Sequence, residues 1–345
     1  MGDVLRTVTG GCGRVNGTAD DGVLRSYLEE DSSMKMQQVS DHCFAVLNEA
    51  NLVCDANSGL INLGEGVVID TQTDLPHARQ MIELFSSVWS GMPRFVVLTH
   101  EDIDHVAGNQ LFPGAEIIAH RAAADRMKHT ADPSESQKLQ HAIDDPATRT
   151  MLETAQPGLL AVASQMRASF DFDGIELVLP TTVFDDRHVL DLGGTEAHLI
   201  YVGPSHQAGD VIVHVPSEGV LFTGDVLFNQ STPMGWVGSY QKFSDTLDRI
   251  IDLDPATIVP GHGPVCGVDA VRQEQAYFRH VLDESRKCFE AGLPPAEAAE
   301  RIELGAYGEW KAPARLVINV ERAYRVEGEA LGCAQLFEVC LPPGQ

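Results

Sequence analysis

The feature that most constrains this chain is a run of histidines and aspartates directly after a short apolar segment. Residues 94–99 (RFVVLT) predict a buried strand, and residues 100–105 (HEDIDH) then place four candidate metal ligands within six positions. Unpaired carboxylates are costly to bury, and metal coordination commonly explains such a density of His and Asp. We therefore expect a metal site at the carboxyl end of this strand. Its candidate ligands are His100, Asp102, Asp104 and His105.

Three later predicted strands repeat this arrangement, in which a polar side chain follows the end of the strand beside a glycine. They lead into the sequences S-H-x-x-G-D, T-G-D and P-G-H-G. Glycine lets the backbone pass close to a metal or a substrate. Since sites in α/β proteins lie beyond the carboxyl ends of the strands, these segments are expected to meet at one edge. The candidates that they add are His206, Asp225 and His262.

Together with H-x-D-x-D-H, these motifs resemble the metallo-β-lactamase superfamily in identity and in order, over about residues 40–265. Within it, the chain looks most like bacterial proteins labelled cyclase or MBL-fold hydrolase. The resemblance implies a four-layer αββα sandwich with a binuclear metal centre. The first metal subsite would comprise His100, Asp102 and His206, and the second Asp104, His105 and His262, with Asp225 bridging them.

One position departs from the usual family motif, because Asp102 stands where a second histidine normally occurs. A carboxylate-rich site favours Mn²⁺ or Fe more than an all-histidine site does, although Zn²⁺ is compatible with it and is the expected cofactor. Two interpretations stay open. Either Asp102 is a ligand and the chain holds two ions, or it is a supporting or solvated acid and the chain holds one.

The residues around the ligand motifs suggest supporting roles. The resemblance places Asp70 behind the metal loop, where it would orient a ligand. We expect Asp210 to brace the loop that carries His206. Substrate contacts are expected after Asp225, with ordinary loop packing as the alternative, and their candidates are Asn229, Trp236 and Tyr240.

The resemblance implies a metal-dependent hydrolase of a small organic molecule. Metal-bound hydroxide would attack an ester, lactone, amide or related electrophile, with Asp104 and Asp102 as catalytic residues. Two alternatives use the same centre: a hydrolytic dehalogenase, and a biosynthetic cyclase or thioesterase. An alternative from another class is a non-catalytic metal-binding module for a protein partner.

The succession of predicted elements divides the chain into three parts. Residues 1–40 are predicted to be an N-terminal arm, 41–265 the catalytic domain, and 266–345 a helical extension. Within the catalytic domain, residues 121–170 have helical spacing, interrupted at Asp132-Pro133, and predict a helical insertion that could cover the metal cleft and set specificity. Asp74 is expected to N-cap a helix over about residues 75–86, and residues 174–179 are predicted to form a strand.

Composition limits the partners that we expect. The chain has 24 Lys and Arg against 50 Asp and Glu, a net charge of −26, which argues against nucleic acid and against an anionic membrane surface. Its seven cysteines include no C-x-x-C pair and predict mostly buried thiols in a reducing compartment. We expect a cytoplasmic protein, because neither a secretory signal nor an apolar run long enough to span a membrane is present. A homodimer is left open.

Overall fold

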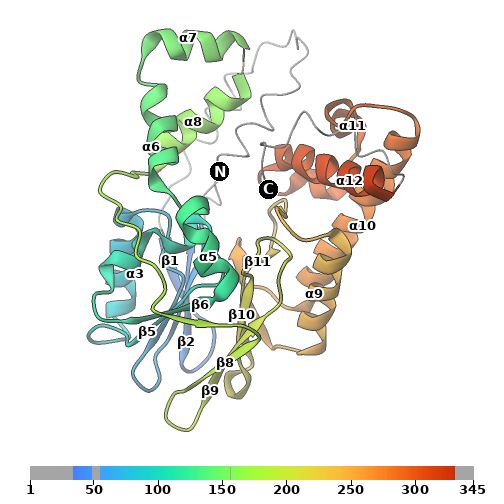
Figure 1. Ribbon diagram of the computed structural model, residues 1–345. Helices are drawn as coiled ribbons and strands as arrows, with labels where there is room; N and C mark the ends of the chain where they lie inside the picture. The colour runs from blue at the N-terminus through green and yellow to red at the C-terminus, as the bar shows by residue number, and fades with distance from the viewer. Residues whose placement is uncertain (1–33, 49–54, 156, 331–345) are drawn as a thin grey trace.

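The computed structural model describes residues 34–48, 55–155 and 157–330, at whose centre two β-sheets pack face to face (Figure 1). Within these residues the first sheet has seven strands in chain order, and the second has five in the order β12-β11-β10-β9-β8. The strands of the first sheet are β1 (Met34–Gln38), β2 (Cys43–Asn48), β3 (Ser58–Ile61), β4 (Val67–Ile69), β5 (Phe95–Val97), β6 (Glu116–His120) and β7 (Thr182–Phe184). Those of the second are β8 (Arg187–Asp191), β9 (Glu196–Tyr201), β10 (Val211–Val215), β11 (Val220–Phe228) and β12 (Thr257–His262).

Alternating side chains explain why two sheets and two helical layers form. In β2, Cys43 and Ala45 join the core between the sheets, whereas Phe44 and Val46 join the outer core beneath the helices. Strands β10 to β12 divide their side chains in the same way, toward the other sheet and toward the C-terminal helices. Each sheet is therefore apolar on both faces, as a sheet covered on both sides must be.

Helices cover both outer faces and complete the predicted αββα sandwich. Asp74 caps α3 by accepting a hydrogen bond from the backbone N–H of His77, so this predicted helix is confirmed in its bounds and in its cap. The helices before β7 are α3 (Leu75–Ser86), α4 (Ile103–Val106), η1 (Ala107–Leu111), α5 (Arg121–Thr130), α6 (Pro133–Ala142), α7 (Pro146–Ala155) and α8 (Pro157–Ser169). Those after β10 are η2 (Pro216–Glu218), α9 (Tyr240–Asp252), α10 (Val268–Glu290), α11 (Pro295–Arg301), η3 (Gly305–Glu309), η4 (Pro313–Arg315) and α12 (Leu316–Ala330).

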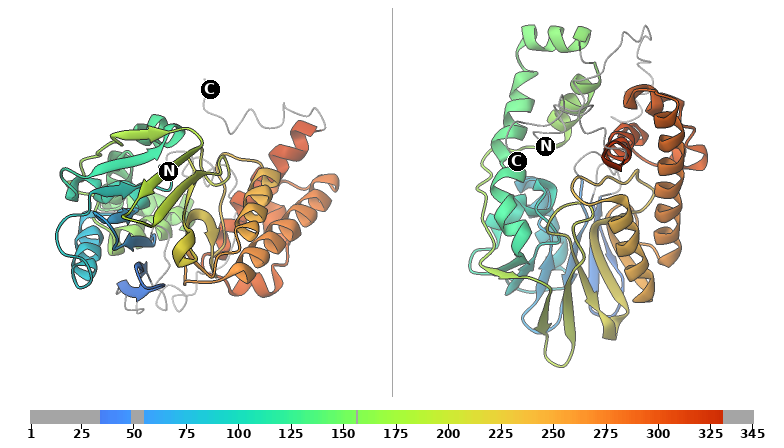
Figure 2. Two further views of the ribbon diagram at one scale, coloured as in Figure 1. Left: turned by 90° about the horizontal axis from the view of Figure 1, so that it is seen from below. Right: turned by 45° about the vertical axis from the view of Figure 1, so that its right-hand side comes forward.

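The helical segments predicted from spacing lie at one end of the sandwich. Helices α5 to α8 occur between β6 and β7. In Figure 1 and in the right-hand view of Figure 2, α6 to α8 rise from the same end of the sheets as α11 and α12. Asp132 caps α6 through the N–H of Ser134, which accounts for the break predicted at Asp132-Pro133. The insertion and the C-terminal helices thus stand beside the edge where the ligand motifs end.

One predicted strand is wrong. Residues 174–179 form no strand, and the seventh strand of the first sheet is β7 instead. The segment is held by side chains of η1: Asn109 donates to the carbonyl of Val178, and Gln110 accepts from the N–H of Glu176. These bonds replace a strand ladder. Of the predicted N-terminal arm, residues 1–33 lie outside the described residues, and Met34–Gln38 form β1.

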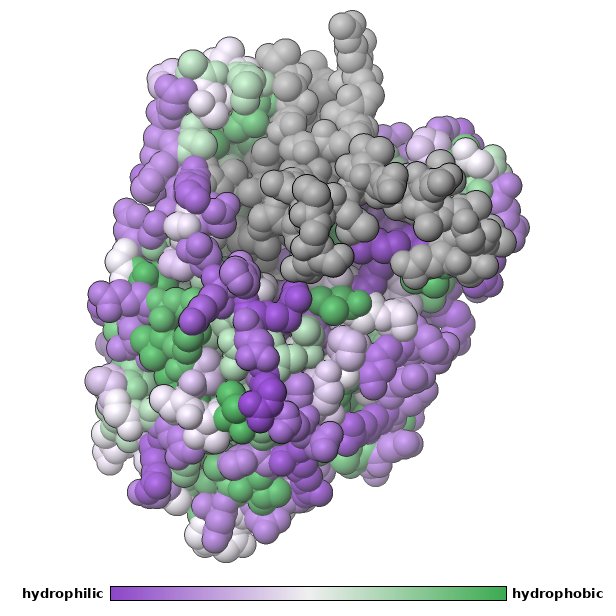
Figure 3. All heavy atoms as spheres, viewed as in Figure 1, coloured by the Kyte–Doolittle hydropathy of each residue, from purple (hydrophilic) through white to green (hydrophobic). Residues whose placement is uncertain are grey.

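The described surface is largely hydrophilic, and of the three described thiols one is buried and two are partly buried. Hydrophilic side chains predominate over the described face seen in Figure 3, with smaller apolar patches between them. Within the described part of the chain, no helix combines the length and the apolar character that crossing a bilayer requires. Cys43, Cys266 and Cys288 are free thiols, and burial raises the pKa of Cys43 and of Cys266 to about 12.

Candidate metal centre

The first ligand motif turns out of β5 into α4. Leu98 continues the outer core, and His100 follows within a buried turn. Asp102 occupies the N-cap position of α4, yet its side chain makes no capping hydrogen bond with the helix. Its carboxylate is directed instead toward the ring nitrogens of His206 and His100. Asp102 thus stands at the start of a helix, but its carboxylate does not cap that helix.

The second motif forms a loop whose backbone is hydrogen-bonded to the carboxylate of Asp210. The backbone N–H of Ser205 donates to Asp210 Oδ2 at 2.8 Å, and that of Gln207 donates to Asp210 Oδ1 at 3.0 Å. Between them, His206 Nδ1 lies 2.8 Å from the carbonyl oxygen of Met234. A ring nitrogen that donates to a carbonyl leaves the opposite nitrogen, Nε2, free to bind a metal.

The last two motifs lie on neighbouring parallel strands. Asp225 is inside β11, just after a break in register at Gly224, and His262 is the last residue of β12. Gly224 has φ +53°, a conformation that favours glycine. A side chain at Gly261 would overlap Asp225 Oδ1, because a Cβ there would lie 2.0 Å from that oxygen. These glycines let the two strands carry their ligands side by side.

The four motifs bring all seven predicted ligands together in two groups that share Asp225. In the first group, Asp102 Oδ2 lies 3.0 Å from His206 Nε2 and 3.7 Å from His100 Nε2. In the second, Asp104 Oδ2 lies 3.4 Å from His262 Nε2 and 3.9 Å from His105 Nε2. Asp225 faces both groups. Its Oδ2 lies 3.2 Å from His262 Nε2 and 3.5 Å from His206 Nε2, and its Oδ1 lies 3.1 Å from His105 Nε2.

These spacings and their unsatisfied atoms fit a divalent metal. Ligand atoms around a tetrahedral ion with bonds near 2.1 Å lie about 3.4 Å apart. Three buried atoms have no hydrogen-bond partner among the described residues: His100 Nε2, His105 Nε2 and Asp225 Oδ1. Each of them lies near other candidate metal-ligand atoms. Buried polar atoms are rarely left without a partner, so atoms that converge without bonding one another fit a shared cation.

The charges of the cluster also call for a cation. Burial opposes ionisation of Asp225, but His262, His105 and His206 hold its pKa well below the usual value. Burial likewise opposes protonation of His206 and His262, yet Asp225 and a second carboxylate raise the pKa of each to about 9. Without metal, protons on these imidazoles balance the carboxylates. A divalent ion would supply the same charge and displace those protons, so metal binding would release protons.

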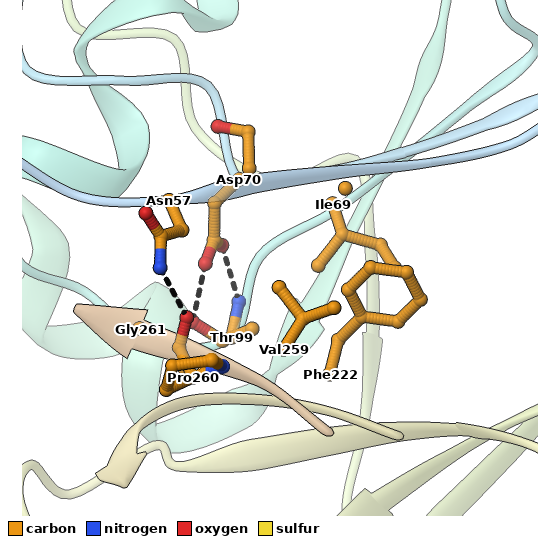
Figure 4. A pocket seen from close by; sticks show the side chains of 11 residues that line it. Asn57, Ile69, Asp70, Thr99, Phe222, Val259, Pro260 and Gly261 are labelled. Atoms are coloured by element: carbon orange, nitrogen blue, oxygen red, sulfur yellow. Dashed lines mark hydrogen bonds between the residues drawn. The ribbon is translucent and has the colours of Figure 1, made fainter. Parts of the chain in front are cut away.

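Asp70, directly after β4, lies behind the cluster and contacts both the metal loop and His105. Its Oδ2 lies 2.8 Å from His105 Nδ1. Its carboxylate also accepts hydrogen bonds from the N–H and the hydroxyl of Thr99 (Figure 4). The same view shows Asn57 reaching the end of β12, where its amide donates to the carbonyls of Pro260 and Gly263. The two sheets are therefore joined directly behind the ligands.

A model of the metallo-beta-lactamase superfamily matches residues 52–262. The chain belongs to the metallo-β-lactamase superfamily. Among curated proteins, the human acyl-coenzyme A thioesterase MBLAC2 is 26% identical over 234 residues, which cover 64% of this chain and 72% of that protein. A hydroxyacylglutathione hydrolase from Edwardsiella ictaluri is 31% identical over 107 residues, 31% of this chain and 39% of that one. A type 2 metallo-beta-lactamase from Bacteroides fragilis is 27% identical over 116 residues, 32% and 47% respectively.

Solved structures match a larger part of this metallo-β-lactamase-fold chain. The sec-alkylsulfatase Pisa1 from Pseudomonas sp. aligns with a TM-score of 0.63 at 17% identity, covering 94% of this chain and 59% of that one. A metallo-beta-lactamase family protein from Thermus thermophilus aligns with a TM-score of 0.55 at 18% identity, covering 80% and 89%. At these identities the likeness shows the fold. Together with the family match, it makes the chain a metallo-β-lactamase-fold hydrolase with a buried His and Asp cluster.

The three residues predicted to contact substrate occupy different environments. Asn229 supports the ligand loop, since it donates to the carbonyl of Pro264 and its N–H donates to the carbonyl of His262. Tyr240 is buried in the core, where its hydroxyl donates to Asn319. Trp236 is half-buried, its N–H donates to the carbonyl of His206, and the two rings lie 6.4 Å apart. Trp236 is therefore the one of the three that is both near a proposed ligand and partly exposed.

Two supporting residues were missed in the sequence. Glu101 is fully buried between two proposed ligands, accepts from Arg126 and from the N–H of Gly209, and its pKa is raised to about 8, chiefly by burial. Gln207 donates to Asp102 Oδ1 at 2.7 Å. Both lie inside the ligand motifs, at variable positions to which the motifs assign no role. The contacts of Glu101 with Gly209 and of Gln207 with Asp102 span more than 100 positions, and no local pattern signals such contacts.

Proposed function

We propose that this metallo-β-lactamase-fold chain is a two-metal hydrolase that cleaves an acyl bond in a small organic molecule. The observation that carries the proposal is the pair of His and Asp groups that share Asp225. His100, Asp102 and His206 would hold one ion, and Asp104, His105 and His262 the other. Zn²⁺ suits this donor set, and its three carboxylates also suit Mn²⁺ or Fe.

Metal ions bound there would lower the pKa of coordinated water and polarise a carbonyl group. The chain's own residues determine where this chemistry occurs. The side chains of Asp102 and Asp104 are 18% and 13% exposed, whereas each of the other five ligand side chains is at most 4% exposed. Water and substrate would therefore reach the centre on the side of these two aspartates, where a carboxylate oxygen of Asp104 would take a proton from the attacking water.

The bond type rests on the relatives and on the charge of the chain. The human relative, a thioesterase by name, aligns over most of its own length, which supports an acyl substrate and keeps a thioester as a second candidate. The net charge of −26 disfavours a polyanionic substrate such as a nucleic acid. We propose a small ester, lactone or amide as the first class to be tested.

A panel of aryl ester, lactone, β-lactam, acyl thioester, aryl halide and alkyl sulfate substrates tests this assignment. We expect the metal-loaded protein to hydrolyse at least one acyl substrate and the D104A variant to lose that activity. Turnover confined to the halide or the sulfate would contradict the acyl assignment. A metal-loaded protein that turns over no member of the panel and retains a protein partner through purification would support the non-catalytic alternative.

A further inference from the structure

The side chains of Asp102 and Gln207 are hydrogen-bonded beside the proposed metal centre, and the two carboxylate oxygens of Asp102 have different partners. Gln207 Nε2 donates to Asp102 Oδ1 at 2.7 Å. Asp102 Oδ2 faces the other way, 3.0 Å from His206 Nε2 and 3.7 Å from His100 Nε2. Oδ1 is thus bonded by an amide that belongs to neither ligand group, and Oδ2 is bonded by His206 Nε2, a proposed metal-binding atom of the first ligand group.

Gln207 is held so that its amide can do this. Its backbone N–H donates to both oxygens of the buried Asp210, at 3.0 and 3.1 Å, and the residue is 4% exposed. The orientation of the amide follows from its neighbour, because a reversed amide would place an oxygen against the Asp102 carboxylate. Oε1 is then left without a hydrogen-bond partner among the described residues. Asp210 therefore fixes the backbone of the loop that carries Gln207, and this backbone places the Gln207 amide against Asp102.

Asp102 stands where its carboxylate could cap a helix instead of binding a metal. It is the N-cap residue of α4, with the extended backbone (φ −76°, ψ 149°) typical of that position. Aspartate there ordinarily accepts a hydrogen bond from the N–H two or three residues later. Asp102 makes no such bond. The amide of Gln207 and the ring of His206 hold the side chain away from the helix, and the Gln207 amide is the one of these two partners that a metal on His206 Nε2 would leave in place.

We propose that Gln207 is a positioning residue that makes Asp102 a metal ligand at the first subsite. The inference rests on the proposed two-metal centre. Histidine ligands are oriented through their second ring nitrogen, as His105 is by Asp70 and His206 by the carbonyl of Met234. Gln207 does the same for a carboxylate, through the oxygen that does not face the ligand group. The aspartate that departs from the family motif is thereby matched with its own supporting side chain.

Metal binding by Gln207→Met tests this, because methionine keeps the length of the side chain and cannot donate. The matched control is Gln140→Met in α6, a buried glutamine whose amide donates to the carbonyls of Met166 and Phe170. Chelator competition measures the affinity for each Zn²⁺, and the absorption spectrum of the Co²⁺-loaded protein reports its coordination. We expect Q207M to bind one of two ions about 10- to 100-fold more weakly with an altered Co²⁺ spectrum, and Q140M to match the wild type.

A second comparison separates positioning from a general structural effect. If Gln207 acts through Asp102, then in a protein that already carries Asp102→Ala the further Q207M change should lower the metal affinity by less than about twofold. The effects of two residues in one network are not additive, because the first change has already removed what the second residue positions. Q207N, which keeps an amide but shortens its reach, replaces Q207M if the latter does not fold.

Two results would overturn the inference alone: wild-type affinity for both ions in Q207M, or an equal loss in the D102A background. A wild-type protein that binds no metal would overturn the proposed function together with it.

Discussion

Oδ2 of Asp70 lies 2.8 Å from Nδ1 of His105, and the same carboxylate accepts two hydrogen bonds from Thr99. Asp70 adopts the left-handed backbone region (φ +57°) and is 2% exposed. One buried carboxylate thus joins the end of β4, the start of the metal loop and a proposed ligand. The arrangement fixes the direction of the His105 ring before any metal binds.

Asp70→Asn is expected to weaken metal binding without disturbing the fold. Asparagine tolerates the left-handed backbone and can still bond Thr99, but its neutral amide is a poorer acceptor for His105. We expect about a 10- to 100-fold lower affinity for one metal ion, measured by chelator competition. Unchanged affinity for both ions in D70N would show that Asp70 has no part in the centre.

Asp104→Ala and His206→Ala should abolish hydrolysis while the protein stays folded. Each removes a proposed ligand from the polar end of the sandwich and leaves the three apolar cores intact. We expect kcat/KM to fall by at least about 10²- to 10⁴-fold, with an unchanged far-ultraviolet circular dichroism spectrum. The control is His214→Ala in β10, a half-buried histidine that belongs to neither ligand group. Substantial activity in D104A would refute its proposed role in proton transfer.

Asn57→Leu is expected to lower the free energy of unfolding by about 1–3 kcal/mol, because it leaves buried acceptors unpaired. The Asn57 amide donates to the carbonyls of Pro260 and Gly263, which flank the loop of His262. Urea denaturation of the metal-free protein gives the stability, and the variant should also bind metal less tightly. Equal stability of N57L and wild type would mean that water replaces both bonds.

Glu274→Gln should flatten the dependence of stability on pH. Burial raises the pKa of Glu274 well above 4.5, so the folded chain keeps the proton where the unfolded chain loses it. Stability then falls as pH rises above 4.5, by up to about 1.4 kcal/mol per pH unit until the folded pKa is reached. The N–H of Phe228 donates a hydrogen bond to Glu274 Oε2 at 2.7 Å, and the side-chain oxygen of glutamine can accept the same bond.

Urea denaturation at several values between about pH 5 and pH 8, with both proteins free of metal, measures this difference. The wild type should lose more stability than E274Q across that range. Parallel curves for the two proteins would contradict a protonated Glu274 in the fold.

The proposed ligands could be recognised in the sequence because each lies close to an apolar run with a readable pattern. His100 follows one such run and His262 another, so the rule for α/β edges predicts that they converge, and the family resemblance divides them between two subsites. The cap of α3 by Asp74 was equally local. Such features depend on neighbours within a few residues, which the sequence displays directly.

Features that depend on distant partners could not be predicted. Residues 174–179 have the composition of a strand, but bonds from Asn109 and Gln110 hold them outside the sheet. Tyr240 follows the Asp225 loop in sequence, yet its hydroxyl is bonded to Asn319 in α12. The pairing of Gln207 with Asp102 joins two motifs that are 105 positions apart. In each case tertiary packing determined what the local pattern left open.

The most direct test of a metal-dependent mechanism is the hydrolysis rate of one protein sample before chelation, after removal of metal, and after metal is returned. On an acyl substrate identified from the panel, we expect the metal-free protein to lose hydrolysis. We also expect recovery as the metal content rises toward two ions per chain. Undiminished hydrolysis by protein shown to be free of metal would contradict the proposal that bound metal drives the reaction.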